Sequence, residues 1–223
     1  MYKIKFTLFF YVLFSFSFIV KSTYAANDSI NSLANSYANL VSHYYNEVSL
    51  STQEMHNAII KFVQAPDNNS LTNAKNKWIA ARSIYGITEA FRFYGGPIDG
   101  VNKYGEEGPE GLINAWPLNE AYIDYVKGNP NAGIINNLTL EINNSTIIAA
   151  NMSEDDADVS SGWHAIEFLL WGQDFSLETA GMREAGDYLP TNEINIRRRA
   201  YLVAASTLLL EHINWLSKEW LEN

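Results

Sequence analysis

The sequence predicts an all-α fold, a helical bundle, from three observations. Apolar residues recur three and four positions apart over residues 30–62, 71–88 and 193–223, which is the periodicity of one helix face. No segment alternates apolar and polar residues as a half-buried strand does. Helix-ending residues follow the first two segments, at Pro66 and at Gly95-Gly96-Pro97.

The first two helices should form part of the core. Asp28 or Ser29 can cap the helix over residues 30–62, and Ser70 can cap the next. A continuous apolar stripe is more often core than a cofactor site, so we interpret both stripes as core. They consist of Leu33, Tyr37, Leu40, Val41, Tyr44, Val48, Met55, Ile59 and Phe62, and then of Leu71, Ala74, Trp78, Ala81, Tyr85 and Thr88.

The middle of the chain carries weaker signals. Residues 95–116 are rich in glycine and acidic residues and predict a long loop, which in a compact domain is usually functional. We expect a short helix over residues 119–127 and two further helical segments over residues 134–140 and 144–151.

Two stronger helices complete the bundle. Ser160 or Ser161 can cap a helix that begins in SGWHAIEFLLWGQD, residues 161–174. Thr191 or Asn192 can cap the last predicted helix. Its buried stripe is predicted to be Ile194, Tyr201, Ala205, Leu208, His212 and Trp215.

Residues 1–25 predict a cleavable signal peptide. Two lysines precede an apolar run over residues 6–20, and Thr23 and Ala25 fit the small residues before a cleavage site. The run is shorter than the ~20 apolar residues of a membrane span, and no cysteine follows that could carry a lipid. We therefore expect export, cleavage, and one mature domain over residues 26–223.

The composition narrows the chemistry. The net charge of −10 becomes −13 when the three lysines of the leader are removed. A chain this acidic repels nucleic acid and favours cations, so we predict no nucleic-acid partner. The absence of cysteine excludes disulfides, thiolate metal ligands and a cysteine nucleophile, which leaves His, Asp, Glu, Tyr and Ser.

His164 and Glu167 are the first candidate metal ligands. Residues three apart share a helix face, so the imidazole and the carboxylate can point at one ion. Bundle helices bind metals with Glu-x-x-His pairs, and this donor combination suits zinc or ferrous iron better than calcium or magnesium. The alternative is that Glu167 is only the hydrogen-bond partner of a core histidine. We interpret the other histidines as structural.

A third ligand is expected from the second helix. Glu89 interrupts an aromatic stretch, and a carboxylate flanked by Phe91 and Phe93 is a poor surface residue unless it has a partner. We therefore predict Glu89 as the third metal ligand, with Asp99 the next candidate. A zinc peptidase is not supported, because H-x-x-E-H ends here in Phe168 rather than in histidine.

Several blocks resemble the imelysin-like proteins. Residues 162–174, GWHAIEFLLWGQD, are similar to the G-x-H-x-x-E signature of that family. Residues 78–99, the segment 107–117, and Arg-Arg-Arg-Ala-Tyr-Leu at 197–202 match in the same order over most of the predicted mature chain.

The resemblance implies an exported, all-helical protein of the Gram-negative periplasm or outer-membrane face. It implies a link to iron uptake, with a metal ion and membrane components of iron import as partners. The metal site proposed for the family maps to His164 and Glu167, whereas Glu89 is our addition. The family is named for an insulin-cleaving peptidase, so a metallopeptidase remains the first alternative. A non-catalytic helical interaction module is the second.

Members of the family normally continue into a second helical bundle. The chain ends at Asn223, after the helix that should lead into that half. We therefore expect only the N-terminal half of the two-bundle architecture, and a site that lacks some of its ligands.

Overall fold

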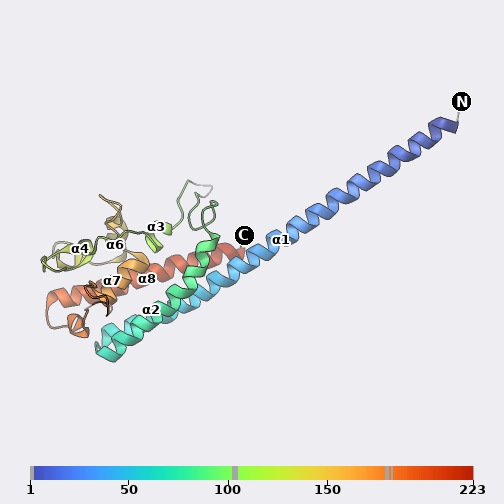
Figure 1. Cartoon of the computed structure of the whole chain (residues 1–223). Helices are drawn as coiled ribbons and strands as arrows, with labels where there is room; N and C mark the ends of the chain where they lie inside the picture. Colours follow the sequence, from blue (N-terminus) through green and yellow to red (C-terminus); the bar gives the residue numbers. More distant parts are fainter. Residues whose placement is uncertain (1–2, 102–104, 179–180, 182, 223) are drawn as a thin grey trace. The chain divides into compact units, whose positions relative to one another are not determined.

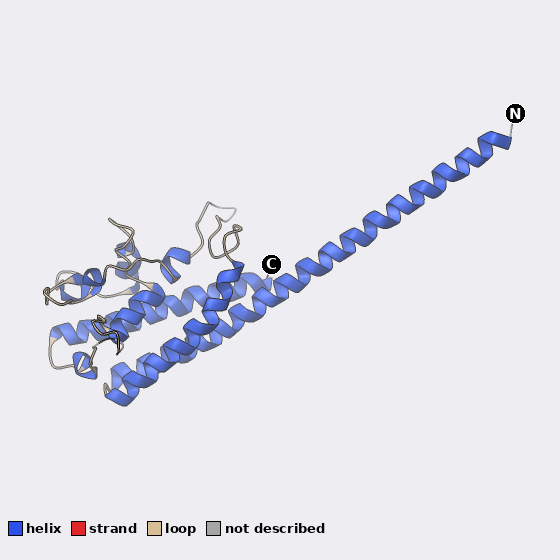
Figure 2. Ribbon diagram, viewed as in Figure 1, coloured by secondary structure: helices blue, strands red, loops and turns tan. Residues whose placement is uncertain are grey.

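The computed structural model describes residues 3–101, 105–178, 181 and 183–222, with side chains from residue 28 to residue 221 outside the same gaps. All regular elements in this part are helices (Figures 1 and 2), so the predicted all-α fold is confirmed. They are α1 (Lys3–Gln64), α2 (Asn68–Thr88), η1 (Glu89–Phe91), α3 (Glu110–Ile113), α4 (Glu120–Ile123), α5 (Gly133–Asn136), α6 (Asn144–Ala150), α7 (Gly162–Trp171), η2 (Ala185–Tyr188) and α8 (Glu193–Glu222).

The chain divides into two compact units, residues 1–41 and residues 42–223. The first unit is a stretch of α1. Leu33 and Leu40, predicted to be core, are 72% and 47% exposed there, so the prediction is wrong at these positions, whereas Val41 of the same predicted stripe is fully buried. The predicted signal peptide, residues 1–25, lies outside the residues whose side chains are described and stays a prediction. No helix in the described part is long and apolar enough to cross a membrane.

In the second unit, the end of α1 runs antiparallel to α8. The hydroxyl of Ser49 donates to Asn214 at 2.6 Å, and about two turns further His56 Nδ1 lies 3.0 Å from the hydroxyl of Ser206. Along and beyond these polar contacts the two helices bury apolar side chains, which supply most of the stabilisation because burial removes them from water. Fully buried here are Tyr45, Val48, Met55, Ile59, Phe62, Tyr201, Leu202, Ala205, Leu209, Ile213 and Leu216.

The helix ends differ in part from the predictions. Asp67, not Ser70, caps α2: its carboxylate accepts from the Ser70 amide at 2.7 Å, while the Ser70 hydroxyl approaches the Asp67 amide. This capping box satisfies two amides that would otherwise lack partners. The predicted stripe of α2 is confirmed, since its six residues are all buried. Asn192 caps α8 as expected, accepting from the Asn195 amide at 2.9 Å.

The short helices lie along one side of α7 and α8 (Figure 1). The helix predicted over residues 119–127 is only four residues long, and the predicted loop over residues 95–116 contains α3. Arg197 of α8 holds the α5 region by hydrogen bonds, since its guanidinium donates to four backbone carbonyls there. Trp215 is 39% exposed, so it does not belong to the buried stripe of α8.

Candidate metal site

The helix that carries the histidine motif is held at its start by backbone contacts. The hydroxyl of Ser161 donates to the carbonyl of Leu112 at 3.0 Å, and that of Ser160 to the carbonyl of Ile147 at 2.7 Å. Ser161 is the N-cap residue of α7, as predicted, but its side chain makes no capping hydrogen bond: both hydroxyls bind α7 to neighbouring segments instead. Gly162 has a φ of +82°, and a Cβ there would lie 2.3 Å from the carbonyl oxygen of Ile113, so only glycine fits.

The buried face of α7 is aromatic. Trp163 is fully buried, and the indole N–H of Trp78 in α2 donates to its carbonyl at 3.1 Å. The ring of Trp78 contacts the rings of both Trp163 and Trp171, at centroid distances of 6.2 and 5.3 Å. On another side, the hydroxyl of Tyr188 donates to the carbonyl of Leu169 at 2.6 Å. These contacts fix the rotation of α7 and therefore decide which residues face outward.

His164 and Glu167 form the outward pair. His164 Nδ1 lies 3.2 Å from Glu167 Oε2, and the two side chains are 17% and 45% exposed. The ring of Trp116, from the segment after α3, lies 4.7 Å from the imidazole ring at an angle of 55°. The predicted pair is therefore together and open to solvent, and an exposed indole rests against the imidazole.

The pair lines a cavity of about 250 Å³, which we call the acidic cavity. Two further carboxylates, Glu120 of α4 and Asp174 after α7, line it as well. Its complete lining is Trp116, Leu118, Glu120, His164, Glu167, Phe168, Trp171, Gly172, Asp174 and Gly181. The cavity thus combines one imidazole and three carboxylates with aromatic walls, a donor set that suits a metal cation.

Sequence reasoning missed Glu120 and Asp174. Asp174 is part of the quoted motif stretch, but it follows the helix, so helical spacing could not relate it to His164. Glu120 is 44 positions before His164, and no local signal connects the two. Gln173 holds Glu120 in place, because its side-chain amide donates to Glu120 Oε2 at 2.6 Å.

Glu89 lies in a different cluster. Its carboxylate accepts from Arg92 at 3.2 Å and from the side-chain amide of Asn114 at 3.0 Å. Arg92 also pairs with Glu110 at 3.0 Å and approaches Asp99 at 3.8 Å. Glu89 and Asp99 are therefore absent from the lining of the acidic cavity, and Arg92 neutralises part of their charge. The role of Glu89 as a third ligand stays a prediction.

His164 and Glu167 could supply two of the donor atoms of a metal site. Metal bonds from nitrogen and oxygen are ~2.0–2.2 Å long, which separates neighbouring ligand atoms by roughly 3 Å. The 3.2 Å between His164 Nδ1 and Glu167 Oε2 matches that separation. Within the part of the chain that the structure describes, no three His, Asp or Glu side chains stand close enough together to hold an ion. For the pair to hold an ion, a third donor would have to move toward it.

Comparison with known proteins identifies a family. The family model described as imelysin, peptidase M75, matches residues 41–223 and so covers the whole of the second unit. No curated protein matches the chain.

Proposed function

The chain belongs to the imelysin family, and on this premise we propose that it is an exported metal-binding protein of iron uptake. The ion would be held by His164 and Glu167 in the acidic cavity. Iron is the proposed ion and zinc the competing one, because both accept an imidazole together with carboxylates.

The observation that carries this proposal is the spacing of the pair within its cavity. An imidazole and a carboxylate 3.2 Å apart already stand as neighbouring ligands of one ion would. The alternative is that Glu167 only holds a structural histidine by a hydrogen bond. That role would suit a buried pair, but Glu167 is 45% exposed. The surrounding carboxylates of Glu120 and Asp174 add negative potential that favours a cation.

The chain's own residues would do the following. Nδ1 of His164 and the facing oxygen of Glu167 share a proton or a hydrogen bond, and a cation that takes its place releases any proton held there. Glu120 or Asp174 would turn toward the pair to supply the third donor. Trp116 would fix the plane of the imidazole, because the indole rests against it. The bound ion itself would supply only its charge.

Export and iron uptake complete the proposal. Cleavage after Ala25 would release the domain into the periplasm or to the outer-membrane face, where membrane components of iron import are the proposed partners. Edman sequencing of the secreted protein tests the first step, and an N-terminus at Ala26 is expected. A protein that retains Met1 in the periplasmic fraction would contradict it.

Titration calorimetry with ferrous and zinc ions tests the binding. We expect about one ion per chain, and a loss of affinity of more than about tenfold in His164→Ala and in Glu167→Gln. His43→Ala and Glu141→Gln are matched controls on exposed residues and should bind like the wild type. Equal affinity in all five proteins would show that the pair is not a ligand set.

Three further variants identify the third donor. Glu120→Gln and Asp174→Asn should weaken binding, whereas Glu89→Gln should do so only if this carboxylate leaves Arg92 and Asn114.

A peptide-hydrolysis assay of the metal-loaded protein tests the metallopeptidase alternative. Peptide turnover that disappears in Glu167→Gln would favour a metallopeptidase over a binding protein.

A further inference from the structure

A second cavity shares Gly172 with the acidic cavity but has the opposite charge. It measures about 170 Å³, and we call it the basic cavity. Arg183 and Lys127 supply its charges, and Val126, Phe175 and the ring of Tyr125 supply apolar walls. Its complete lining is Tyr125, Val126, Lys127, Gly172, Gln173, Phe175 and Arg183. Nothing in the metal-binding proposal uses this cavity.

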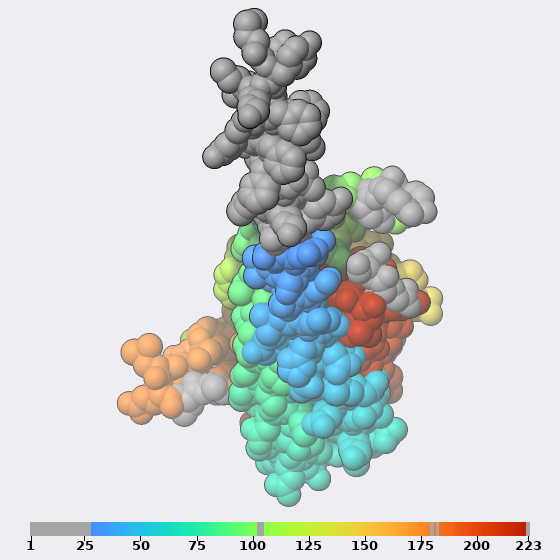
Figure 3. Space-filling model, turned by 90° about the vertical axis from the view of Figure 1, so that its right-hand side faces the viewer, coloured from blue at the N-terminus to red at the C-terminus, as the bar shows by residue number. Residues whose placement is uncertain are grey.

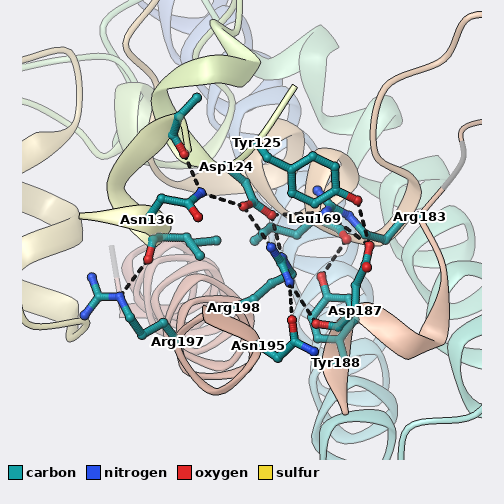
Figure 4. Close-up of polar contacts among 12 residues, drawn as sticks. Asp124, Tyr125, Asn136, Leu169, Arg183, Asp187, Tyr188, Asn195, Arg197 and Arg198 are labelled. Atoms are coloured by element: carbon teal, nitrogen blue, oxygen red, sulfur yellow. Dashed lines mark hydrogen bonds and ion pairs between the residues drawn. The ribbon is translucent and has the colours of Figure 1, made fainter. Parts of the chain in front are cut away.

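Two buried arginines share one carboxylate beside the basic cavity (Figure 4). Asp124, fully buried, accepts from Arg198 Nε at 2.6 Å and pairs with Arg183 Nη1 at 3.1 Å. Every nitrogen of Arg198 has an acceptor: besides the Nε bond, Nη2 donates to Asp124 at 3.1 Å, and Nη1 donates to the Asp187 carbonyl and to Asn195. A buried guanidinium normally finds acceptors for all its nitrogens, and Arg198 follows that rule.

Arg183 breaks the rule. Its side chain is 1% exposed, yet among the described residues only Nη1 has acceptors, in Asp124 and, at 3.5 Å, in Asp187. Its Nε and Nη2 atoms have no hydrogen-bond partner among the described residues. These two nitrogens form one edge of the guanidinium, and such an edge fits the two oxygens of a carboxylate. This buried cation thus has a bidentate edge without an acceptor in the described part of the chain, and it lines a cavity, which indicates a missing acceptor.

The surroundings hold this edge in one orientation and keep it positive. The Arg183 guanidinium lies over the rings of Tyr125 and Phe168, at 4.6 and 5.4 Å from their centroids. Burial raises the pKa of Tyr125, although Arg183 opposes the rise, so the phenol stays neutral and donates to Asp187 at 2.8 Å. Arg183 and Arg198 face the two carboxylates of Asp124 and Asp187, and Lys127 of the cavity lining adds one positive charge.

We propose that the basic cavity binds the carboxylate group of a small organic acid with a short apolar tail. The carboxylate pairs with the Nε–Nη2 edge of Arg183, and Lys127 adds a second positive charge at the rim. The tail lies against Val126 and Phe175. A planar carboxylate fits the guanidinium edge, and the apolar walls favour a ligand with a hydrocarbon part over inorganic phosphate.

Titration of the purified protein with butyrate tests the proposal, with phosphate as the second probe. Butyrate should bind once per chain, and phosphate should bind at least about tenfold more weakly. Arg183→Lys should weaken butyrate binding by about tenfold or more, because a lysine cannot pair bidentately. Lys127→Gln should weaken it less, and Lys61→Gln, at an exposed lysine that does not line the cavity, should leave it unchanged.

A second variant guards against misfolding of Arg183→Lys. Val126→Phe fills the cavity, leaves every charge in place, and should abolish butyrate binding while the circular dichroism spectrum stays that of the wild type. Absence of butyrate binding to the wild type would overturn the proposal and leave the cavity to solvent. Binding that survives in Val126→Phe, or phosphate that binds as well as butyrate, would overturn it too.

Discussion

The acidic and basic cavities share Gly172, and their charges are opposite. The acidic cavity is lined by three carboxylates and a histidine, and the basic cavity by an arginine and a lysine. Gln173 contacts both groups: its amide nitrogen donates to Glu120 at 2.6 Å, and its amide oxygen accepts from the Lys127 backbone at 2.6 Å. A neutral side chain therefore stands where the two sets of charges meet.

The charged side chains of the two cavities are held in different parts of the domain. The arginines are buried and tied to Asp124 in the interior, so the basic cavity depends on the core of the domain. Glu167 and Asp174 are solvent-accessible, so the acidic cavity depends on the outward face of α7 and on the segment after it. That segment, around residues 175–178, stands out from the surface in Figure 3. Substitutions in the core should therefore lower the stability of the domain, and substitutions at the surface should lower the affinity for a ligand.

Asp124→Asn should have the largest effect on stability. It leaves Arg183 and Arg198 buried without their shared counter-charge, and breaking a buried ion pair in this way costs about 3–5 kcal/mol. Urea denaturation measures the free energy of unfolding. Asp156→Asn, an exposed carboxylate, is the matched control and should lie within about 0.5 kcal/mol of the wild type. A small effect at Asp124 would mean that water or another acceptor reaches the arginines.

Gly172→Ala should have the next largest effect and should damage both cavities. Gly172 has φ 69° and ψ −166°, a region that only glycine adopts without strain, so alanine costs about 1–3 kcal/mol. A Cβ would also lie 3.3 Å from the Arg183 amide nitrogen. Gly86→Ala is the opposite case: it lies within α2 with open space around it and should stabilise by about 0.5–1 kcal/mol. Equal effects at the two glycines would contradict this account.

Trp116→Ala should leave stability almost unchanged and weaken metal binding roughly two- to tenfold, because it removes one aromatic ring contact of about 0.5–1.5 kcal/mol. Trp116 is 69% exposed but rests against His164, so its removal frees the imidazole. Calorimetry with ferrous ion measures the change. Trp215→Ala removes another partly exposed indole, in α8, that lines neither cavity, and should bind metal normally.

Acid should destabilise the domain through histidines outside both cavities. Burial lowers the pKa of His56 and, against the opposing effect of Glu211, that of His212. Because the folded pKa values lie below the ordinary 6.5, the folded state binds fewer protons than the unfolded chain. Their stabilising contribution is complete above pH 6.5 and is lost as the pH falls below it. Between pH 7.5 and 5.5, the melting temperature of the double variant His56→Gln, His212→Gln should fall less than that of the wild type.

The sequence predicted the long helices because their apolar period is regular, as the six buried residues of α2 show. It also predicted that His164 and Glu167 meet, since three-residue spacing on a helix decides that. It could not place Glu120, whose position depends on the packing of a four-residue helix, or Arg183, which follows a loop. It placed the N-cap of α7 at Ser160 or Ser161, and Ser161 is that residue; however, both hydroxyls bind distant carbonyls, a tertiary contact that local capping rules do not include.

One reciprocal experiment tests the central claim that the two cavities take ligands of opposite charge. Glu167→Gln and Val126→Phe are each titrated with ferrous ion and with butyrate. Glu167→Gln should lose the metal and keep butyrate, and Val126→Phe should lose butyrate and keep the metal. Metal binding that persists in Glu167→Gln, or a variant that loses both ligands while still folded, would contradict the claim.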